Sequence, residues 1–162
     1  MNASTNKVAQ KLRMTSSGFT LIELMVTIAV LAIIVSIAAP SISTQLANQR
    51  VKSTTASLKN ALREAKIESI IRRQSLTLTY NNNSTNEGVI NIAQGADIIA
   101  SYNYSANSTI KPVLPTAITF EPSKRANAVT YTICDSNLAA APSQIGVSKL
   151  GNISSKLGGT CP

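Results

Sequence analysis

The sequence predicts an α+β protein, in which a long N-terminal helix packs on an antiparallel β-sheet. Two observations lead to this prediction. Between Ser41 and Gln74 the chain has neither glycine nor proline, and its apolar residues recur every three or four positions. After Arg73, apolar and polar residues alternate in short runs that polar turns separate, which is typical of antiparallel strands.

The composition argues against an enzyme. The 162 residues include no histidine, and of the few acidic residues only Glu64 and Glu68 lie close together. General acid–base catalysis and metal binding both need such side chains. We therefore expect no catalytic residue, cofactor or metal. The net charge of +8 resides mainly in residues 1–18 and 41–75, which is unlike a uniformly basic nucleic-acid-binding domain.

The N-terminal region combines a basic leader with an apolar segment. The leader, residues 1–18, precedes 21 residues (19–39) dominated by Leu, Ile, Val and Ala, in which Glu23 is the only charged residue. A secretory signal would instead place its apolar core before the cleavage site. A helix of this length spans about 31 Å, enough to cross the hydrocarbon of a bilayer. We predict a transmembrane helix over residues 19–39.

Residues 40–75 are expected to continue this helix as an amphipathic segment, with a bend near Pro40 because proline disrupts helical hydrogen bonding. Its apolar stripe requires a surface to bury it, and the following sheet is the candidate. The stripe consists of Val51, Thr55, Leu58, Leu62, Ala65 and Ser69, and the opposite side carries Lys59, Arg63, Lys66 and Arg73.

Residues 76–162 are expected to form a β-rich head. A first strand at 76–80 is followed by a polar turn at 81–88. Two further strands over 88–104 flank a turn at 94–97. Residues 117–122 and 128–134 are predicted to form a hairpin around the turn 123–127. A short strand at 145–150, and another around 153, complete the head.

The two cysteines, Cys134 and Cys161, both lie in the predicted head. Without histidine or a Cys-x-x-Cys pattern they are poor metal ligands. A disulfide formed in an oxidising compartment is the natural interpretation, and two unrelated reduced thiols are the alternative.

The stretch GFTLIELMV, residues 18–26, has a family resemblance. It resembles the type III signal sequence of type IV pilins and type II secretion pseudopilins. The resemblance implies that a prepilin peptidase cleaves after Gly18 and methylates the new N-terminal Phe19. It also implies that Glu23 is the fifth residue of the mature protein and that Pro40 is the helix-bending proline common in the family. An ordinary signal anchor is the alternative.

The same resemblance suggests why a carboxylate lies within the apolar segment. A charged residue at the centre of a membrane helix costs about 3 kcal/mol, and less near the interface. In the family, this glutamate pairs with the α-amino group of a neighbouring subunit. Glu23 would therefore stabilise only a subunit that is docked in register. The alternative is that the carboxylate simply reaches the lipid headgroups.

The second half of the chain is similar to the FimT/GspH group of minor pilins and pseudopilins. The resemblance rests on residues 55–80, where a basic helix runs directly into a strand, and on residues 118–134 and 144–154. It implies a minor subunit that primes or joins a retractable type IV pilus, or alternatively a GspH-like pseudopilin of a type II secretion system. Either protein would be held in the inner membrane with its head in the periplasm, and a pilus subunit would reach the cell surface.

Some members of this group bind double-stranded DNA for uptake in natural transformation, through a Gly-Arg-x-Arg motif near the C-terminus. The matching stretch is Gly151-Asn152-Ile153-Ser154, in which neutral residues occupy both arginine positions. Four nearby cations could contact phosphates in a salt-dependent manner. These cations are Lys149, Lys156, Lys124 and Arg125, and ordinary surface solvation is the alternative role for them.

Overall fold

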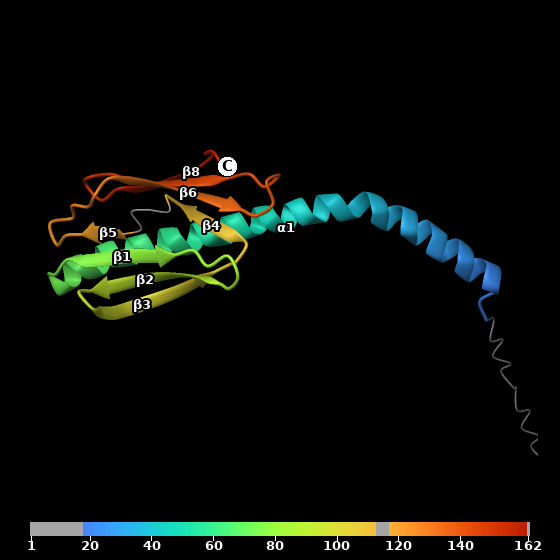
Figure 1. The fold of residues 1–162 in the computed structure, drawn as a ribbon, viewed down its shortest axis with the longest axis horizontal. Coiled ribbons are helices and arrows are strands. Elements are labelled where there is room, and N and C mark those ends of the chain that lie inside the picture. The colour runs from blue at the N-terminus through green and yellow to red at the C-terminus, as the bar shows by residue number, and fades with distance from the viewer. Residues whose placement is uncertain (1–17, 113–116, 162) are drawn as a thin grey trace, which may run out of the picture. The chain divides into compact units, whose positions relative to one another are not determined.

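The computed structural model describes residues 18–112 and 117–161, with the side chains of residues 38–41 left out. The chain divides into two compact units, Met1–Ala38 and Ala39–Pro162. Helix α1 (Leu21–Arg72) supplies the described secondary structure of the first unit and continues into the second (Figure 1). The bend predicted at Pro40 falls where the two units meet and is not described further, and residues 1–17 of the predicted leader lie outside the described residues.

Eight strands follow α1 in the second unit, and all their pairings are antiparallel, as the alternating pattern predicted. Buried and partly exposed residues alternate along β1, β2 and β7. The strands are β1 Leu76–Asn81, β2 Gly88–Gln94, β3 Asp97–Tyr104, β4 Ser108–Lys111, β5 Ala117–Phe120, β6 Val129–Asp135, β7 Ser143–Val147 and β8 Ile153–Leu157. The α+β fold class is therefore confirmed.

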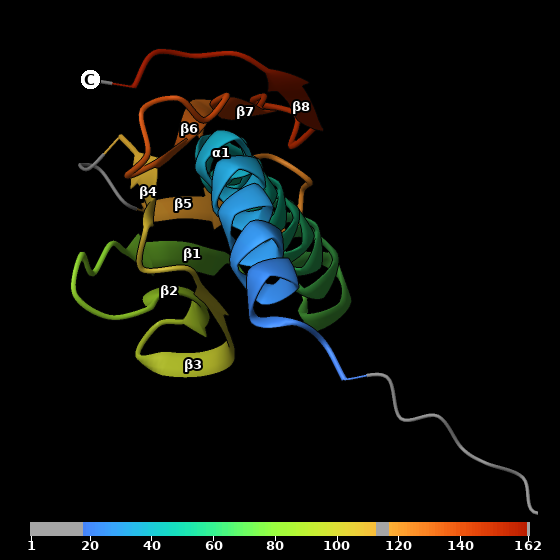
Figure 2. The ribbon, with the colours of Figure 1, turned by 90° about the vertical axis from the view of Figure 1, so that its right-hand side faces the viewer.

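The strands form two sheets of four strands each, where the sequence analysis expected one. Their orders are β3-β2-β1-β5 and β4-β6-β7-β8. The chain passes from the first sheet to the second between β3 and β4, returns to the first at β5, and enters the second again at β6. Figure 2 looks along α1 and shows the helix lying against both sheets.

The predicted hairpin of residues 117–122 and 128–134 is wrong. β5 pairs with β1 in one sheet, whereas β6 pairs with β4 and β7 in the other. A single bridge, Phe120 to Ala126, is what remains of the expected pairing. Alternation identifies the buried face of a strand, but it does not identify the neighbouring strand.

Two further differences concern short strands. Strand β4, which has four residues, was not predicted from the sequence. The strand predicted at 145–150 lies instead at Ser143–Val147, because residues 148–151 form a turn. In that turn the Gly151 N–H donates to the Ser148 carbonyl at 2.8 Å, and the Ser148 N–H donates to the Asn152 carbonyl at 3.0 Å.

One hydrophobic core joins α1 to both sheets. The predicted stripe of α1 is buried at Val51, Leu58, Leu62, Ala65 and Ser69, while Thr54 rather than Thr55 completes it. Tyr80 of the first sheet and Tyr131 of the second pack edge to face, with ring centroids 5.7 Å apart. The other fully buried large side chains come from both sheets: Leu76, Leu78, Ile90, Ile92, Ile118 and Phe120 from the first, and Ile110, Ile133 and Ile145 from the second.

The C-terminus of α1 turns the chain directly into β1. Arg73 has a positive φ of 55°. The Gln74 N–H donates to the Ser69 carbonyl at 3.2 Å, and the Arg73 N–H donates to the Ile70 carbonyl at 3.3 Å. These two bonds form a Schellman motif, which satisfies carbonyls that the helix end leaves unpaired. The helix therefore ends without glycine.

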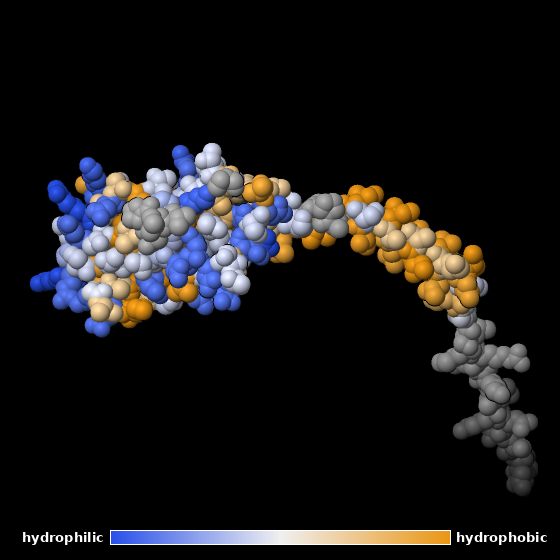
Figure 3. Space-filling view, viewed as in Figure 1, coloured by the Kyte–Doolittle hydropathy of each residue, from blue (hydrophilic) through white to orange (hydrophobic). Residues whose placement is uncertain are grey.

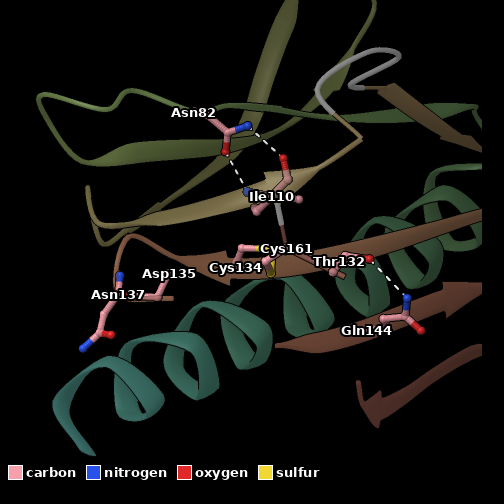
Figure 4. Close-up of a disulfide and its surroundings, with 8 residues drawn as sticks. All are labelled: Asn82, Ile110, Thr132, Cys134, Asp135, Asn137, Gln144 and Cys161. Atoms are coloured by element: carbon pink, nitrogen blue, oxygen red, sulfur yellow. Dashed lines mark hydrogen bonds between the residues drawn. A yellow bond between two sulfur atoms is a disulfide. The ribbon is translucent and has the colours of Figure 1, made fainter. Parts of the chain in front are cut away.

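Asn82 connects the two sheets by side-chain hydrogen bonds (Figure 4). Its amide Nδ2 donates to the Ile110 carbonyl at 2.8 Å, and its Oδ1 accepts from the Ile110 N–H at 2.9 Å. The Tyr104 hydroxyl also donates to this Oδ1, at 2.7 Å. Asn82 thereby pairs with β4 as a neighbouring strand would.

We expect Asn82→Ala to lower the free energy of unfolding by about 2 kcal/mol, because it leaves the polar backbone groups of buried Ile110 unpaired. Denaturant unfolding would measure the change. Asn103→Ala is the matched control, because Asn103 is exposed and bonds only to Glu87 in the described contacts. Equal stabilities of the two variants would contradict this role for Asn82.

Candidate functional site

The start of α1 carries the residues that the sequence analysis assigned to processing and assembly. Gly18 and Phe19 precede the helix and are exposed. Thr20 caps it: the Leu24 N–H donates to the Thr20 carbonyl at 3.2 Å, and the Glu23 N–H donates to the Thr20 Oγ1 at 3.3 Å. The bond between Gly18 and Phe19 therefore lies in a non-helical segment just before a capped helix.

Glu23 lies in the first turn of α1, with its side chain exposed. A carboxylate there interacts favourably with the positive end of the helix dipole. Thr20 and Glu23 have the spacing of a capping box, a sequence signal that the sequence analysis did not use. Among the described residues, no cation forms an ion pair with the Glu23 carboxylate.

The first unit exposes apolar side chains on all sides of α1. Its large hydrophobic residues from Phe19 to Ile37 are 49–81% exposed, and Figure 3 shows this part of α1 as mostly orange on the face in view. Soluble proteins rarely expose so much contiguous apolar surface. In the described residues, no single helical segment by itself has the length and apolar character of a membrane span. The two parts of α1, Leu21–Ile37 and Ile42–Arg72, meet those criteria only when they are taken together as a bent pair.

In the head, Arg50 of α1 forms a bidentate ion pair with Asp135 at the end of β6. Arg50 Nε lies 2.9 Å from Asp135 Oδ2, and Arg50 Nη2 lies 2.8 Å from Oδ1. The Asp135 side chain is fully buried and that of Arg50 is 22% exposed. The pair ties the helix to the second sheet, and the sequence analysis missed it because 85 residues separate the partners.

The surroundings of Asp135 stabilise its charged form. Burial by itself would raise the pKa of the carboxyl, but hydrogen bonds from Arg50 and from the Asn137 N–H outweigh burial. The charge of Arg50 acts in the same direction, so the pKa of Asp135 lies below its ordinary value. Asp135 therefore stabilises the fold above that ordinary pKa, and the contribution is lost as the pH falls through the lowered one.

Cys134 and Cys161 form the predicted disulfide (Figure 4), with their Cα atoms 5.9 Å apart. The bond joins β6 to the tail after β8 and closes a loop with a sequence separation of 27. In the chain-entropy model such a loop contributes about 3.5 kcal/mol to stability. The prediction of a disulfide is confirmed.

The structure brings together three of the four cations predicted to contact DNA. Lys124 and Arg125 lie in the turn after β5, and Lys149 lies in the turn between β7 and β8. The Ala126 N–H donates to the Lys149 carbonyl at 3.2 Å and joins the turns. Lys156 lies apart from them, on β8 beside Gln144.

Two cations of α1 lie beside the stretch that matches the Gly-Arg-x-Arg motif. Lys66 Nζ donates to the Gly151 carbonyl at 2.9 Å. Arg63 and Lys66 line a hollow of about 350 Å³ together with Asn152. Gly151 has a φ of +65°, and a Cβ there would lie 2.7 Å from the Lys124 carbonyl oxygen, so this close approach requires glycine. This contact of α1 with the turn was not predicted from the sequence, because 85 residues separate Lys66 from Gly151.

Metal ligands do not gather in the part of the chain that the structure describes. Residues 18–112 and 117–161 contain no group of three Cys, Asp or Glu side chains arranged to hold an ion.

Comparison with known proteins supports the class suggested by the N-terminus and the fold. A family profile described as the prokaryotic N-terminal methylation motif matches residues 13–39. A search of curated proteins finds no match to the sequence. Motif and fold together define a type IV pilin-like protein.

The similar solved structures are of a minor pilin. One crystal structure of the Pseudomonas aeruginosa type IV minor pilin FimU matches with a TM-score of 0.59 and 18% identity, covering 70% of this chain and 96% of that one. A second crystal form of FimU matches with a TM-score of 0.56 and 17% identity, covering 68% of this chain and 99% of that one. At this level of identity the likeness shows that the chain has the fold of a minor pilin.

Asp135→Asn should lower the free energy of unfolding by about 3 kcal/mol near neutral pH, because it leaves the Arg50 guanidinium without its anionic partner. The difference from wild type should shrink as the pH falls below the ordinary pKa of an aspartate, about 3.9. Urea unfolding at a series of pH values would measure this. Asp97→Asn, at the exposed start of β3, should change stability little. A pH-independent difference for Asp135→Asn would contradict the ion pair.

Proposed function

We propose that the chain is a minor subunit of a type IV pilus, of FimT or FimU type, which joins or primes a retractable filament. Its role is structural, not enzymatic. The observation that carries the proposal is the N-terminal methylation motif at residues 13–39, which leads directly into a helix with exposed apolar side chains. The minor-pilin fold of the head supports it.

Processing by a prepilin peptidase would remove the leader, residues 1–18, and methylate Phe19. The exposure of Gly18 and Phe19 ahead of the helix supports this step, because a protease needs an extended, accessible peptide bond. A Cβ built at Gly18 meets nothing within 4 Å, so the described residues leave space around this bond.

Residues 19–39 would hold the processed subunit in the inner membrane, with residues 40–75 and 76–162 forming the head in the periplasm. The exposed apolar surface of α1 supports a lipid environment before assembly. The disulfide supports an oxidising compartment for the head. After assembly, the same apolar surface would pack against the helices of other pilins.

The charge of Glu23 would stabilise a subunit only when that subunit is docked against a neighbour in the filament. Away from water, a carboxylate is stable only when it is paired and hydrogen-bonded. Cleavage after Gly18 creates an α-amino group, which can serve as the partner in a neighbouring subunit. The exposed carboxylate in the first turn of α1, without an ion pair among the described residues, supports this role.

DNA binding by the head is a second function, favoured by one specific observation. Lys124, Arg125 and Lys149 are exposed on two turns joined by a backbone hydrogen bond, and Arg63 and Lys66 line the next hollow. Such a cluster suits contacts to phosphates without base recognition. Glu121 beside Arg125 and Lys149 weakens its field.

Glu23→Ala should leave leader cleavage intact but reduce incorporation into sheared pili by about tenfold or more, because the α-amino group of the neighbour loses its partner. Mass spectrometry of the N-terminus and immunoblots of the pilus fraction would measure the two steps. Ser36→Ala, a small polar change in the same segment, should assemble normally.

Normal incorporation of Glu23→Ala would contradict the pairing. The location of the wild-type chain distinguishes a type IV pilus subunit from a type II secretion pseudopilin. If it were absent from pili but present in a type II secretion pseudopilus, the GspH-like alternative would replace the proposed function.

The triple variant Lys124→Ala, Arg125→Ala, Lys149→Ala should weaken binding of a short DNA duplex to the full chain and flatten the dependence of affinity on salt. Each lost phosphate contact should reduce the salt slope by about one. Lys156→Ala should have little effect, because Lys156 lies apart from these turns. Fluorescence anisotropy at several salt concentrations would measure both. Equal effects of the two variants would contradict the cluster.

A further inference from the structure

Strand β8 presents an open sheet edge. It is the last strand in the order β4-β6-β7-β8, and it pairs only with β7 among the described strands. Ser154, Ser155, Lys156 and Leu157 are exposed. The outer edge of β8 therefore offers a row of backbone N–H and C=O groups that another extended chain can pair with.

The described part of the C-terminal tail, up to residue 161, does not cover this edge. The Gly158 N–H donates to the Pro142 carbonyl at 2.9 Å. A Cβ at Gly159 would lie 2.7 Å from Thr132 Cγ2 and 3.1 Å from Gln144 Cγ, so the tail crosses the face of the sheet towards Cys134. Figure 2 shows this segment running away from β8 above the other strands. The disulfide thus holds the described tail on the outer face.

A hollow of about 430 Å³ lies between β8 and α1. Val51 and Ala56 of α1 and Leu157 of β8 provide apolar walls, and Leu157 is 76% exposed. Lys52 and Lys59 of α1 also line it. The small side chain of Ala56 leaves room between the two lysines, so the hollow can accept an apolar side chain with cations on either side.

The charged residues that line this hollow, the groove between β8 and α1, are all basic. Lys52, Lys59 and Arg63 follow one another along α1, and none forms an ion pair among the described residues. Lys59 Nζ instead donates to Ser155 Oγ of β8 at 2.9 Å. No carboxylate lines this hollow or the adjacent one at Arg63 and Lys66. An occupant with negative charge is therefore favoured.

We propose that the groove between β8 and α1 binds an extended acidic segment of a partner protein, which adds to the second sheet as a further strand. Its backbone would pair with the edge of β8, because strand addition gains affinity from main-chain hydrogen bonds. Its inward side chains would alternate with outward ones. One apolar side chain would enter the hollow, and acidic side chains two positions away would reach Lys52 and Lys59.

The test uses the full-length chain in detergent and a fluorescent peptide, Thr-Glu-Thr-Leu-Thr-Glu-Thr, whose inward face carries Glu, Leu and Glu. We expect saturable binding by fluorescence anisotropy. Lys52→Glu combined with Lys59→Glu should weaken it by about tenfold or more, because charge complementarity is reversed. Lys156→Glu is the control: it makes the same type of charge change on β8, the strand that the peptide would pair with, but at a position outside the hollow's lining. It should bind nearly as wild type.

Three further binding measurements distinguish strand addition from other ways in which the peptide could bind. The same peptide with N-methylated backbone amides should lose binding, because it cannot pair with β8. A Lys-for-Glu version of the peptide should not bind. The milder variant Lys52→Gln, at an exposed position, should weaken binding less than the double variant while its thermal unfolding stays that of wild type.

The proposal is overturned if the acidic peptide does not bind, or if its N-methylated form binds equally well. If Lys156→Glu weakened peptide binding as much as the double variant does, the loss of binding would come from general surface charge and the proposed groove would be wrong. If a DNA duplex, and not the peptide, depended on Lys52 and Lys59, the groove would be a site for nucleic acid instead. Filament incorporation of Glu23→Ala does not bear on any of these outcomes.

Discussion

The burial of one apolar stripe of α1 against two sheets is the constraint on which the rest of the head depends. Leu58 and Leu62 are fully buried, and burying a leucine contributes about 2 kcal/mol. Ala61 and Ala65 beside them are small, so both sheets can approach the helix closely. Strands that contribute to this core direct alternate side chains into it, which accounts for the alternating burial of β1, β2 and β7.

Specific bonds define how the sheets and the helix meet. Asn82 ties β4 to the first sheet, and the ion pair of Arg50 with Asp135 ties α1 to β6. Asp135 directly follows Cys134, so the ion pair and the disulfide both act at the same end of β6. Apolar contacts tolerate small shifts, whereas a bidentate ion pair and a covalent bond each require a defined geometry. The disulfide also holds the described tail away from the outer edge of β8.

A single helix carries two different surfaces. Its start exposes apolar side chains on all sides, which suits lipid or other apolar helices, whereas its second part buries one stripe and presents cations along the edge of β8. Charged side chains of both parts are suited to partners of opposite charge, and for a buried charge such a partner is needed. Asp135 finds that partner within the chain. For Glu23 we propose a partner in another subunit, and for the basic groove an acidic segment of another protein.

The local features follow from the sequence alone, because each depends on neighbouring residues or on a unique pairing. The motif at Gly18, Phe19 and Glu23 lies within six residues, the stripe of α1 follows from helical periodicity, and two cysteines leave one possible intramolecular disulfide. Only the tertiary structure decided that β5 and β6 enter different sheets and that Arg50 forms an ion pair with Asp135. It also decided that the turn of Lys149 lies beside the turn of Lys124, whereas Lys156 lies apart from both. Periodicity determines which face of an element is buried; its neighbours depend on contacts between distant segments, which no local pattern encodes.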